Sequence, residues 1–169
     1  MKKFLLIFLI LFVLISAAIL VIGRKKRVTY TIPLDFTQVG QGSMLLRDKN
    51  DRVYSAVITS YQGFEKFKDL YPIELNLTGK DFKYSFYIVA FSDSSWGVEA
   101  DGFKQKYASS YYYLDVADTG MDIKAKPPPE GKKYTAYAVI KVSDKVVDRN
   151  KIGHVQVREG VLNGLTKWF

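Results

Sequence analysis

Apolar and polar residues alternate in several stretches of the chain with a period of two, which is typical of a β-strand that buries one face. The clearest alternation is "IGHVQVR" near the C-terminus. Phe86–Phe91, by contrast, is almost continuously apolar, and this predicts a central strand that is covered on both faces. Strand-like runs are predicted at residues 83–91, 97–106, 109–116, 134–142 and 152–158.

Two further stretches extend the strand pattern. Residues 44–47 and 53–59 flank the polar cluster "DKND", and this arrangement predicts a hairpin with its turn at 48–51. Residues 28–43 contain strand-forming threonines and valines but also a proline and glycines, so we expect an extended lead-in or linker there.

One helix is predicted, from Tyr61 to about Leu70. Ser60 is suited to cap its N-terminus, Phe64 and Phe67 follow at helical spacing, and a proline closes the segment. The apolar stripe is narrow, so we expect this helix to lie on a sheet rather than to be surrounded by other elements.

Together these elements predict an α+β fold, with one antiparallel or mixed sheet of about six strands and the helix packed on one of its faces. We expect a single domain of this kind at residues 44–169. An N-terminal transmembrane helix is predicted to precede it, within a membrane anchor at residues 1–27.

Residues 4–23 form an uninterrupted stretch without a charged side chain. A helix of twenty residues spans about 30 Å, the thickness of the hydrocarbon core of a bilayer. The alternative is a cleaved secretory signal with a small-residue cleavage site at Ser16–Ala18. The apolar run continues past this site and stops at four basic residues, Arg24–Arg27, and this pattern favours an uncleaved single-pass anchor.

The positive charge of the chain is concentrated around this apolar stretch. The formal net charge is +8, but six of the 25 Lys and Arg residues lie within the first 27 positions. That leaves 19 basic residues against 17 acidic ones in the remainder, which is therefore close to neutral. We expect no nucleic-acid binding. Basic residues flank both ends of the stretch, so the charge distribution does not decide on which side of the membrane the domain lies. The Tyr-rich, strand-patterned remainder favours an extracytoplasmic domain.

Few residues are suited to catalysis or to metal binding. The chain has no cysteine and one histidine, His154, which excludes disulfides and metal sites built from several Cys or His ligands. Asp115, Asp118 and Asp122 lack the spacing of a calcium loop, and a turn after a strand is the simpler interpretation. We therefore expect no enzymatic activity, no cofactor and no metal; a hydrolase with an unrecognised acidic site is the alternative.

Aromatic residues are the best candidates for a binding surface. We expect Trp96, Tyr111, Tyr112 and Tyr113 to bind a partner, because aromatic side chains supply a large contact area at modest entropic cost. In a strand, Tyr111 and Tyr113 point to one face and Tyr112 to the other. Alternatives are the stacking of a carbohydrate or another ligand on the same aromatics, and the packing of the tyrosines in the core.

The stretch from Tyr54 to Lys141 has a pattern similar to that of a known family. It begins with "YSAVITSYQGFEKFKDLY", a strand followed by a Ser-capped helix and an aromatic pair. "GKDFKYSFYIVAFSDSSWGVEA" continues it, with Asp81 and Phe82 before the central apolar strand. "YYYLDV" and "KAKPPPEGKKYTAYAVIKV" complete it. The pattern resembles the PrcB family, whose members stabilise protease complexes.

This resemblance implies a non-enzymatic domain at the cell envelope that binds and stabilises a partner protein, such as a protease. The family's lipoprotein members carry a lipid-attachment cysteine, which this chain lacks. A membrane anchor at residues 4–23 would serve the same tethering purpose.

Overall fold

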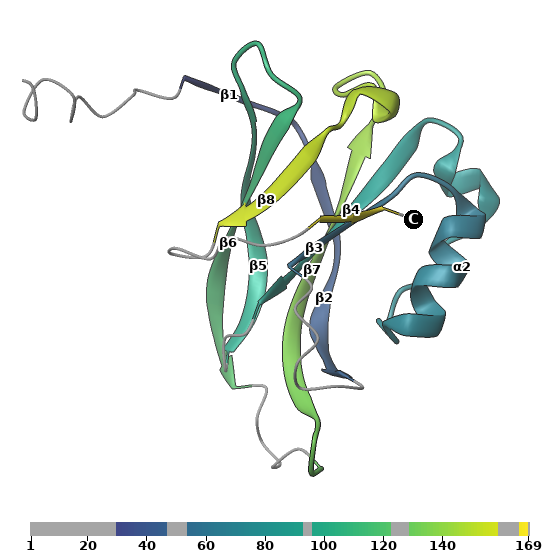
Figure 1. Ribbon diagram of the computed structural model, residues 1–169, viewed down its shortest axis with the longest axis vertical. Coiled ribbons are helices and arrows are strands. Elements are labelled where there is room, and N and C mark those ends of the chain that lie inside the picture. The colour runs from purple at the N-terminus through teal and green to yellow at the C-terminus, as the bar shows by residue number, and fades with distance from the viewer. Residues whose placement is uncertain (1–29, 47–53, 93–95, 123–128, 159–165, 169) are drawn as a thin grey trace, which may run out of the picture.

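The computed structural model describes residues 30–46, 54–92, 96–122, 129–158 and 166–168. Its strands form two sheets that pack face to face, and a helix covers the far side of the second sheet (Figure 1). The first sheet has the order β1 (Thr31–Pro33), β5 (Trp96–Lys106), β6 (Tyr111–Asp122) and β8 (His154–Arg158). The second has the order β2 (Thr37–Leu46), β7 (Lys133–Ser143), β4 (Ser85–Ser92), β3 (Ser55–Ile58) and β9 (Thr166–Trp168).

Most neighbouring strands run antiparallel, but the two sheets each contain one parallel pair. β8 lies parallel to β6, and β9 lies parallel to β3. β8 and β9 are the last two strands that the structure describes, and each lies at the edge of a sheet whose other strands come earlier in the sequence. In the described ranges, the helices that connect the strands are α2 (Tyr61–Leu70) and the 3-10 helices η1 (Gly79–Phe82) and η2 (Arg149–Lys151).

The space between the two sheets is filled by apolar side chains from both. β6 and β8 contribute alternate residues, because their other face is turned to solvent. β4 and β7 contribute alternate residues as well, and their remaining side chains point to the opposite side, toward the helix. The core between the sheets includes Phe86, Ile88, Phe103, Leu114, Ile140, Val155 and Val157.

A second core lies between the five-stranded sheet and α2. Phe64 and Phe67 of the helix are fully buried there, and Tyr87 and Tyr137 meet them from the sheet. Every residue of β4 is consequently buried, as the continuous apolar run predicted, and β4 occupies the middle of its sheet. The predicted helix is also confirmed, with Ser60 as its N-cap.

The predicted fold class was wrong. We expected an α+β fold with one sheet of about six strands, whereas the described residues form a mostly β structure with a four-stranded and a five-stranded sheet. The physical reason is that a period of two reveals that one face of a strand is buried, but not which layer covers it. The hairpin expected across 44–59 was wrong as well, because β2 pairs with β7 while β3 pairs with β4 and β9.

The transmembrane helix expected at residues 4–23 lies outside the described residues. Among those that the structure does describe, no helix is long and apolar enough to cross a membrane. The expected lead-in at 28–43 contains β1 and much of β2. These strands pair with β5 and β7 respectively, so this segment contributes to both sheets.

Candidate functional site

The structure separates the four aromatic residues that the sequence suggested as a binding surface. Three of them begin β6, whereas Trp96 begins β5, which runs antiparallel to it. Trp96 lies opposite Asp122, and Gln105 lies opposite Tyr112, so the tryptophan and the tyrosines occupy opposite ends of this strand pair. The side chain of Trp96 is outside the described part of the structure.

Tyr112 belongs to the core rather than to an exposed surface. Its side chain points between the sheets, is 3% exposed and stacks on Phe103 with ring centroids 5.8 Å apart. Burial, followed by the nearby charge of Asp148, raises the pKa of its hydroxyl group. The expectation that this ring offers contact area to a partner is therefore corrected: among the three consecutive tyrosines, Tyr112 faces inward.

Tyr111 and Tyr113 lie on the opposite, outer face of the four-stranded sheet. Tyr111 is 50% exposed and Tyr113 is half-buried. The parallel register with β8 sets Tyr111 opposite His154 and Tyr113 opposite Gln156. The predicted alternation of the tyrosines between two faces is thus confirmed.

One carboxylate organises the middle of this outer face. Asp115 follows Tyr113 on the same face of β6, opposite Arg158 of β8. Its Oδ1 accepts a hydrogen bond of 2.7 Å from Arg158 Nε, and its Oδ2 accepts one of 2.7 Å from Lys104 Nζ. Burial alone would raise the pKa of Asp115, but the hydrogen bonds and charges of Lys104 and Arg158 hold it below the usual value. The carboxylate is therefore ionised at neutral pH and fixes two cations in place.

Arg158 and a further basic residue, Lys106, lie against the aromatic rings of this face. The guanidinium carbon of Arg158 is 4.2 Å from the centroid of the Tyr113 ring, a close cation–π distance. Lys106 Nζ is 5.9 Å from the Tyr111 ring, and the imidazole of His154 packs 5.3 Å from that ring on its other side. We call this surface the aromatic–cationic face; it comprises Lys104, Lys106, Tyr111, Tyr113, Asp115, His154 and Arg158.

The arrangement favours binding of a negatively charged group. Lys104, Lys106 and Arg158 contribute three positive charges against the single negative charge of Asp115. Arg158 is held by Asp115 on one side and by the Tyr113 ring on the other, so little side-chain entropy is left to lose when it meets a partner.

Sequence reasoning found the tyrosines of this face but missed its cations. Residues 109–118 contain no Lys or Arg, so the sequence of β6 alone gives no sign of a positively charged surface. The positive charges come from the neighbouring strands β5 and β8, and the register that brings them beside the tyrosines cannot be read from the sequence. The only available signal was the placement of Lys104, Lys106 and Arg158 at alternate positions of predicted strands.

The acidic residues do not form a separate site. Asp115, Asp118 and Asp122 were expected in a turn after a strand, but all three lie within β6, which continues to Asp122. Within the described ranges, no group of three or more His, Asp or Glu side chains is placed to hold a metal ion.

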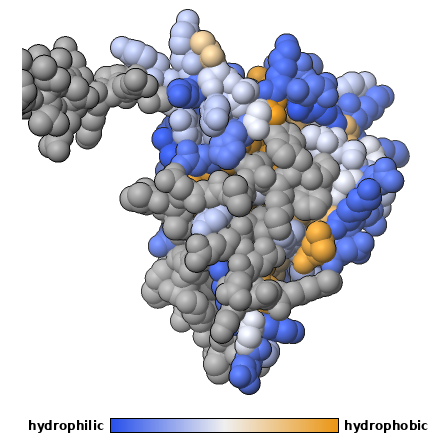
Figure 2. All heavy atoms as spheres, in the orientation of Figure 1, coloured by the Kyte–Doolittle hydropathy of each residue, from blue (hydrophilic) through white to orange (hydrophobic). Residues whose placement is uncertain are grey.

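The rest of the surface shows no large apolar area in the orientation of Figure 2. Described residues on this face are mostly hydrophilic, and hydrophobic residues appear only as small separate patches. Among the described residues outside the aromatic–cationic face, the exposed aromatic side chains are Tyr30, Tyr61, Tyr84 and Tyr107. Isolated exposed apolar residues are normal for a protein surface and do not by themselves indicate an interface.

Comparisons with family models, with curated proteins and with solved structures give no match for this chain. The resemblance to the PrcB family therefore stays a prediction.

Proposed function

We propose that this protein binds and stabilises a partner protein through the aromatic–cationic face, and that the partner presents an acidic contact surface. The observation that carries the proposal is the juxtaposition of Arg158 with Tyr113 and of Lys106 with Tyr111 on one sheet face. Tyrosine and arginine are enriched among residues that dominate the energy of protein interfaces. A protease complex is the partner class that the family resemblance suggests.

The sheet itself supports this role. Strands position side chains more precisely than loops do, and β6 is paired on both sides, with β5 and with β8. The core behind these strands is closely filled by Phe103, Leu114 and Val157. A partner therefore meets a preorganised surface and needs to order few side chains on binding.

We further propose that the domain works next to a membrane. The support is the uncharged stretch at residues 4–23 and the basic residues that flank it. The envelope is the location that the family resemblance suggests, with the domain on the extracytoplasmic side.

The proposal is tested by capture of partners with the full chain, tagged at the C-terminus and extracted from its native membrane in mild detergent. We expect one protein to be recovered in stoichiometric amount and identified by mass spectrometry. Lys106→Glu and Tyr111→Ser should each weaken its binding about tenfold or more, because they remove a charge and a ring from the proposed contact surface. Neither residue is part of the Asp115 ion pairs.

Two variants on other surfaces serve as matched controls. Lys66→Glu changes the same charge on the exposed side of α2, and Tyr84→Ser removes an exposed ring that also lies near a lysine. Both should leave recovery of the partner unchanged. If all four variants recover it equally, or if no stoichiometric partner appears, the aromatic–cationic face is not a protein-binding surface.

A further inference from the structure

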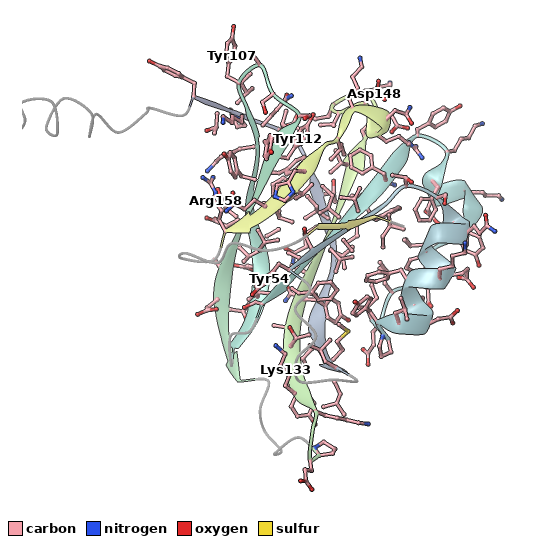
Figure 3. All side chains as sticks on the ribbon, viewed as in Figure 1. Tyr54, Tyr107, Tyr112, Lys133, Asp148 and Arg158 are labelled. Atoms are coloured by element: carbon pink, nitrogen blue, oxygen red, sulfur yellow. The ribbon has the colours of Figure 1, made fainter. Side chains whose placement is uncertain are left out.

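A cleft of about 410 Å³ opens at the end of the molecule where β5 turns into β6. This volume lies within the range of roughly 300–1,000 Å³ that is typical of small-ligand sites. One wall is the β5–β6 turn and the other is the connection from β7 to β8. Figure 3 shows Tyr112 and Asp148 toward this end, and Arg158 away from it at the far end of β8. The lining residues are Gln105, Ser109, Ser110, Tyr112, Val146, Val147, Asp148 and Lys151.

The hydroxyl group of Tyr112 opens into this cleft without a hydrogen-bond partner. The residue is 97% buried by its neighbours, since only 3% of it is exposed. No hydrogen bond joins its hydroxyl to any described residue, yet no fully buried polar side-chain atom of the described part lacks a partner. The hydroxyl is therefore not fully buried, and Tyr112 lines the cleft. Because this hydroxyl makes no hydrogen bond within the described protein and is not fully buried, it is available to a ligand.

The walls of the cleft are held in position by hydrogen bonds. The backbone N–H groups of Gly153 and His154 both donate to the carbonyl oxygen of Ser110, at 3.0 and 3.1 Å. Gln105 Nε2 donates to the Ser109 carbonyl oxygen at 2.8 Å. Gly153 is needed for this close approach, because a Cβ atom there would lie 2.9 Å from Ser110 Cβ.

Arg149 holds the connection from β7 to β8, which forms the second wall of the cleft, in place. Its Nη1 donates to the Thr59 carbonyl oxygen at 2.7 Å and its Nη2 to the Phe82 carbonyl oxygen at 2.9 Å, while Asp144 accepts from the same guanidinium group. The loop that carries Asp148 is thereby tied to the end of β3 and to η1. The cleft is preformed, so a ligand needs to order little of the protein.

The lining is polar but carries no net charge. Asp148 Oδ2 lies 3.5 Å from Lys151 Nζ, so the one carboxylate is balanced by one ammonium group. The other polar groups are three hydroxyls and one amide, which both donate and accept hydrogen bonds. Val146 and Val147 add a small apolar surface beside them.

From this chemistry we infer that the cleft binds a neutral polyhydroxylated ligand, namely a sugar residue or a related polyol. The hydroxyl groups of such a ligand match the Tyr112 hydroxyl, the Asp148 carboxylate and the Gln105 amide, while its C–H face matches the two valines. A carboxylate in the lining disfavours an anion. A single carboxylate that lies beside an ammonium group does not suit a divalent cation.

This site is distinct from the aromatic–cationic face. Tyr112 and Tyr113 are consecutive residues of β6 whose side chains point to opposite faces of the sheet. A ligand in the cleft therefore contacts the first residue and not the second. Tyr113→Phe removes the same hydroxyl group as Tyr112→Phe and serves as the matched control.

The test uses the full chain with ¹³C-labelled valine methyl groups, in micelles of a phosphocholine detergent. Alkyl glucoside and maltoside detergents are avoided because their headgroups are sugars. Glucose, N-acetylglucosamine and their β-1,4-linked disaccharides are titrated up to about 10 mM. We expect at least one of them to shift the methyl signals of Val146 and Val147 in a saturable manner. Glucuronate, which carries a carboxylate, should bind more weakly than glucose.

Tyr112→Phe and Asp148→Asn should each raise the Kd of that sugar about threefold to tenfold, and Tyr113→Phe should leave it within about twofold. Both cleft variants preserve side-chain shape, and unchanged methyl spectra before titration report that the fold is intact. The inference is overturned if no neutral sugar shifts the two valines. It is also overturned if Tyr112→Phe and Asp148→Asn bind as tightly as the unaltered chain, whether or not the protein partner is recovered.

Discussion

Asp115 is the residue on which the geometry of the aromatic–cationic face depends, since it holds both Lys104 and Arg158. The pKa of Asp115 is lower in the folded state than its unfolded-state value of about 3.8. The ionised carboxylate therefore stabilises the fold above pH 3.8, and this stabilisation is lost as the pH falls through the folded-state pKa. We predict that Asp115→Asn lowers the free energy of unfolding by about 1 kcal/mol at pH 7.

The difference between the two proteins should become smaller below about pH 3.8. Urea unfolding of the unaltered chain and of the variant at pH 7 and pH 3 measures it. A constant difference at both pH values would mean that packing of Asp115, rather than its charge, stabilises the fold. Asp35→Asn, at an exposed position between β1 and β2, controls for the loss of one negative charge.

For single residues, the sequence predicted which neighbouring side chains share a face of a strand, but not whether that face lies in the core or on the surface. The alternation of Tyr111, Tyr112 and Tyr113 follows from strand geometry and was predicted correctly. Which of the two faces meets solvent depends on the second sheet, and no local pattern reveals that sheet. Tyr112 was therefore assigned to a surface although its ring lies in the core.

Helix α2 is the element whose sequence and structure agree most closely. Ser60 Oγ accepts a hydrogen bond of 3.1 Å from the Gly63 backbone N–H, which would otherwise lack a partner at the start of the helix. We predict that Ser60→Ala lowers the free energy of unfolding by about 1 kcal/mol. Ser60→Asp keeps the acceptor and should remain within a few tenths of a kcal/mol, so about equal urea midpoints for both variants would contradict the capping role.

The strands could be located from the sequence, but their pairing could not. β4 was predicted correctly as a central strand because both its faces are buried and its apolar run is continuous. β2 and β3 were expected to form a hairpin, since they are neighbours in sequence. In the structure β7 and β4 separate them, an arrangement that requires strand pairing between residues about a hundred positions apart, such as Thr37 with Lys141.

At the scale of the whole molecule, both candidate sites depend on the way in which the late strand β8 joins the first sheet. It supplies Arg158 to the aromatic–cationic face, and the connection that leads into it supplies Asp148 to the cleft. The alternating pattern of residues 152–158 predicted a half-exposed strand, which the burial pattern of β8 confirms. It did not predict that β8 would lie parallel to β6, and the composition of both sites follows from that register.

The two cores also indicate how the N-terminal segment relates to the rest of the chain. Among the described residues, which begin at Tyr30, every buried apolar residue of both cores lies from Met44 onward, and residues 1–27 contribute to none of these described contacts. We predict that a chain starting at Val28 is no longer retained in the membrane fraction after an alkaline carbonate wash, whereas the full chain is retained.

The urea midpoint of the shortened chain should equal that of the full chain extracted in detergent, because the packing of both sheets and of α2 is preserved. Retention of the shortened chain on membranes would place the membrane contact within the domain itself. The intact mass of the full chain recovered from membranes separates the two interpretations of the N-terminus. An uncleaved anchor keeps residues 1–18, and a cleaved signal loses them. Only the first outcome leaves the uncharged stretch at 4–23 available to hold the aromatic–cationic face and the cleft close to the membrane surface.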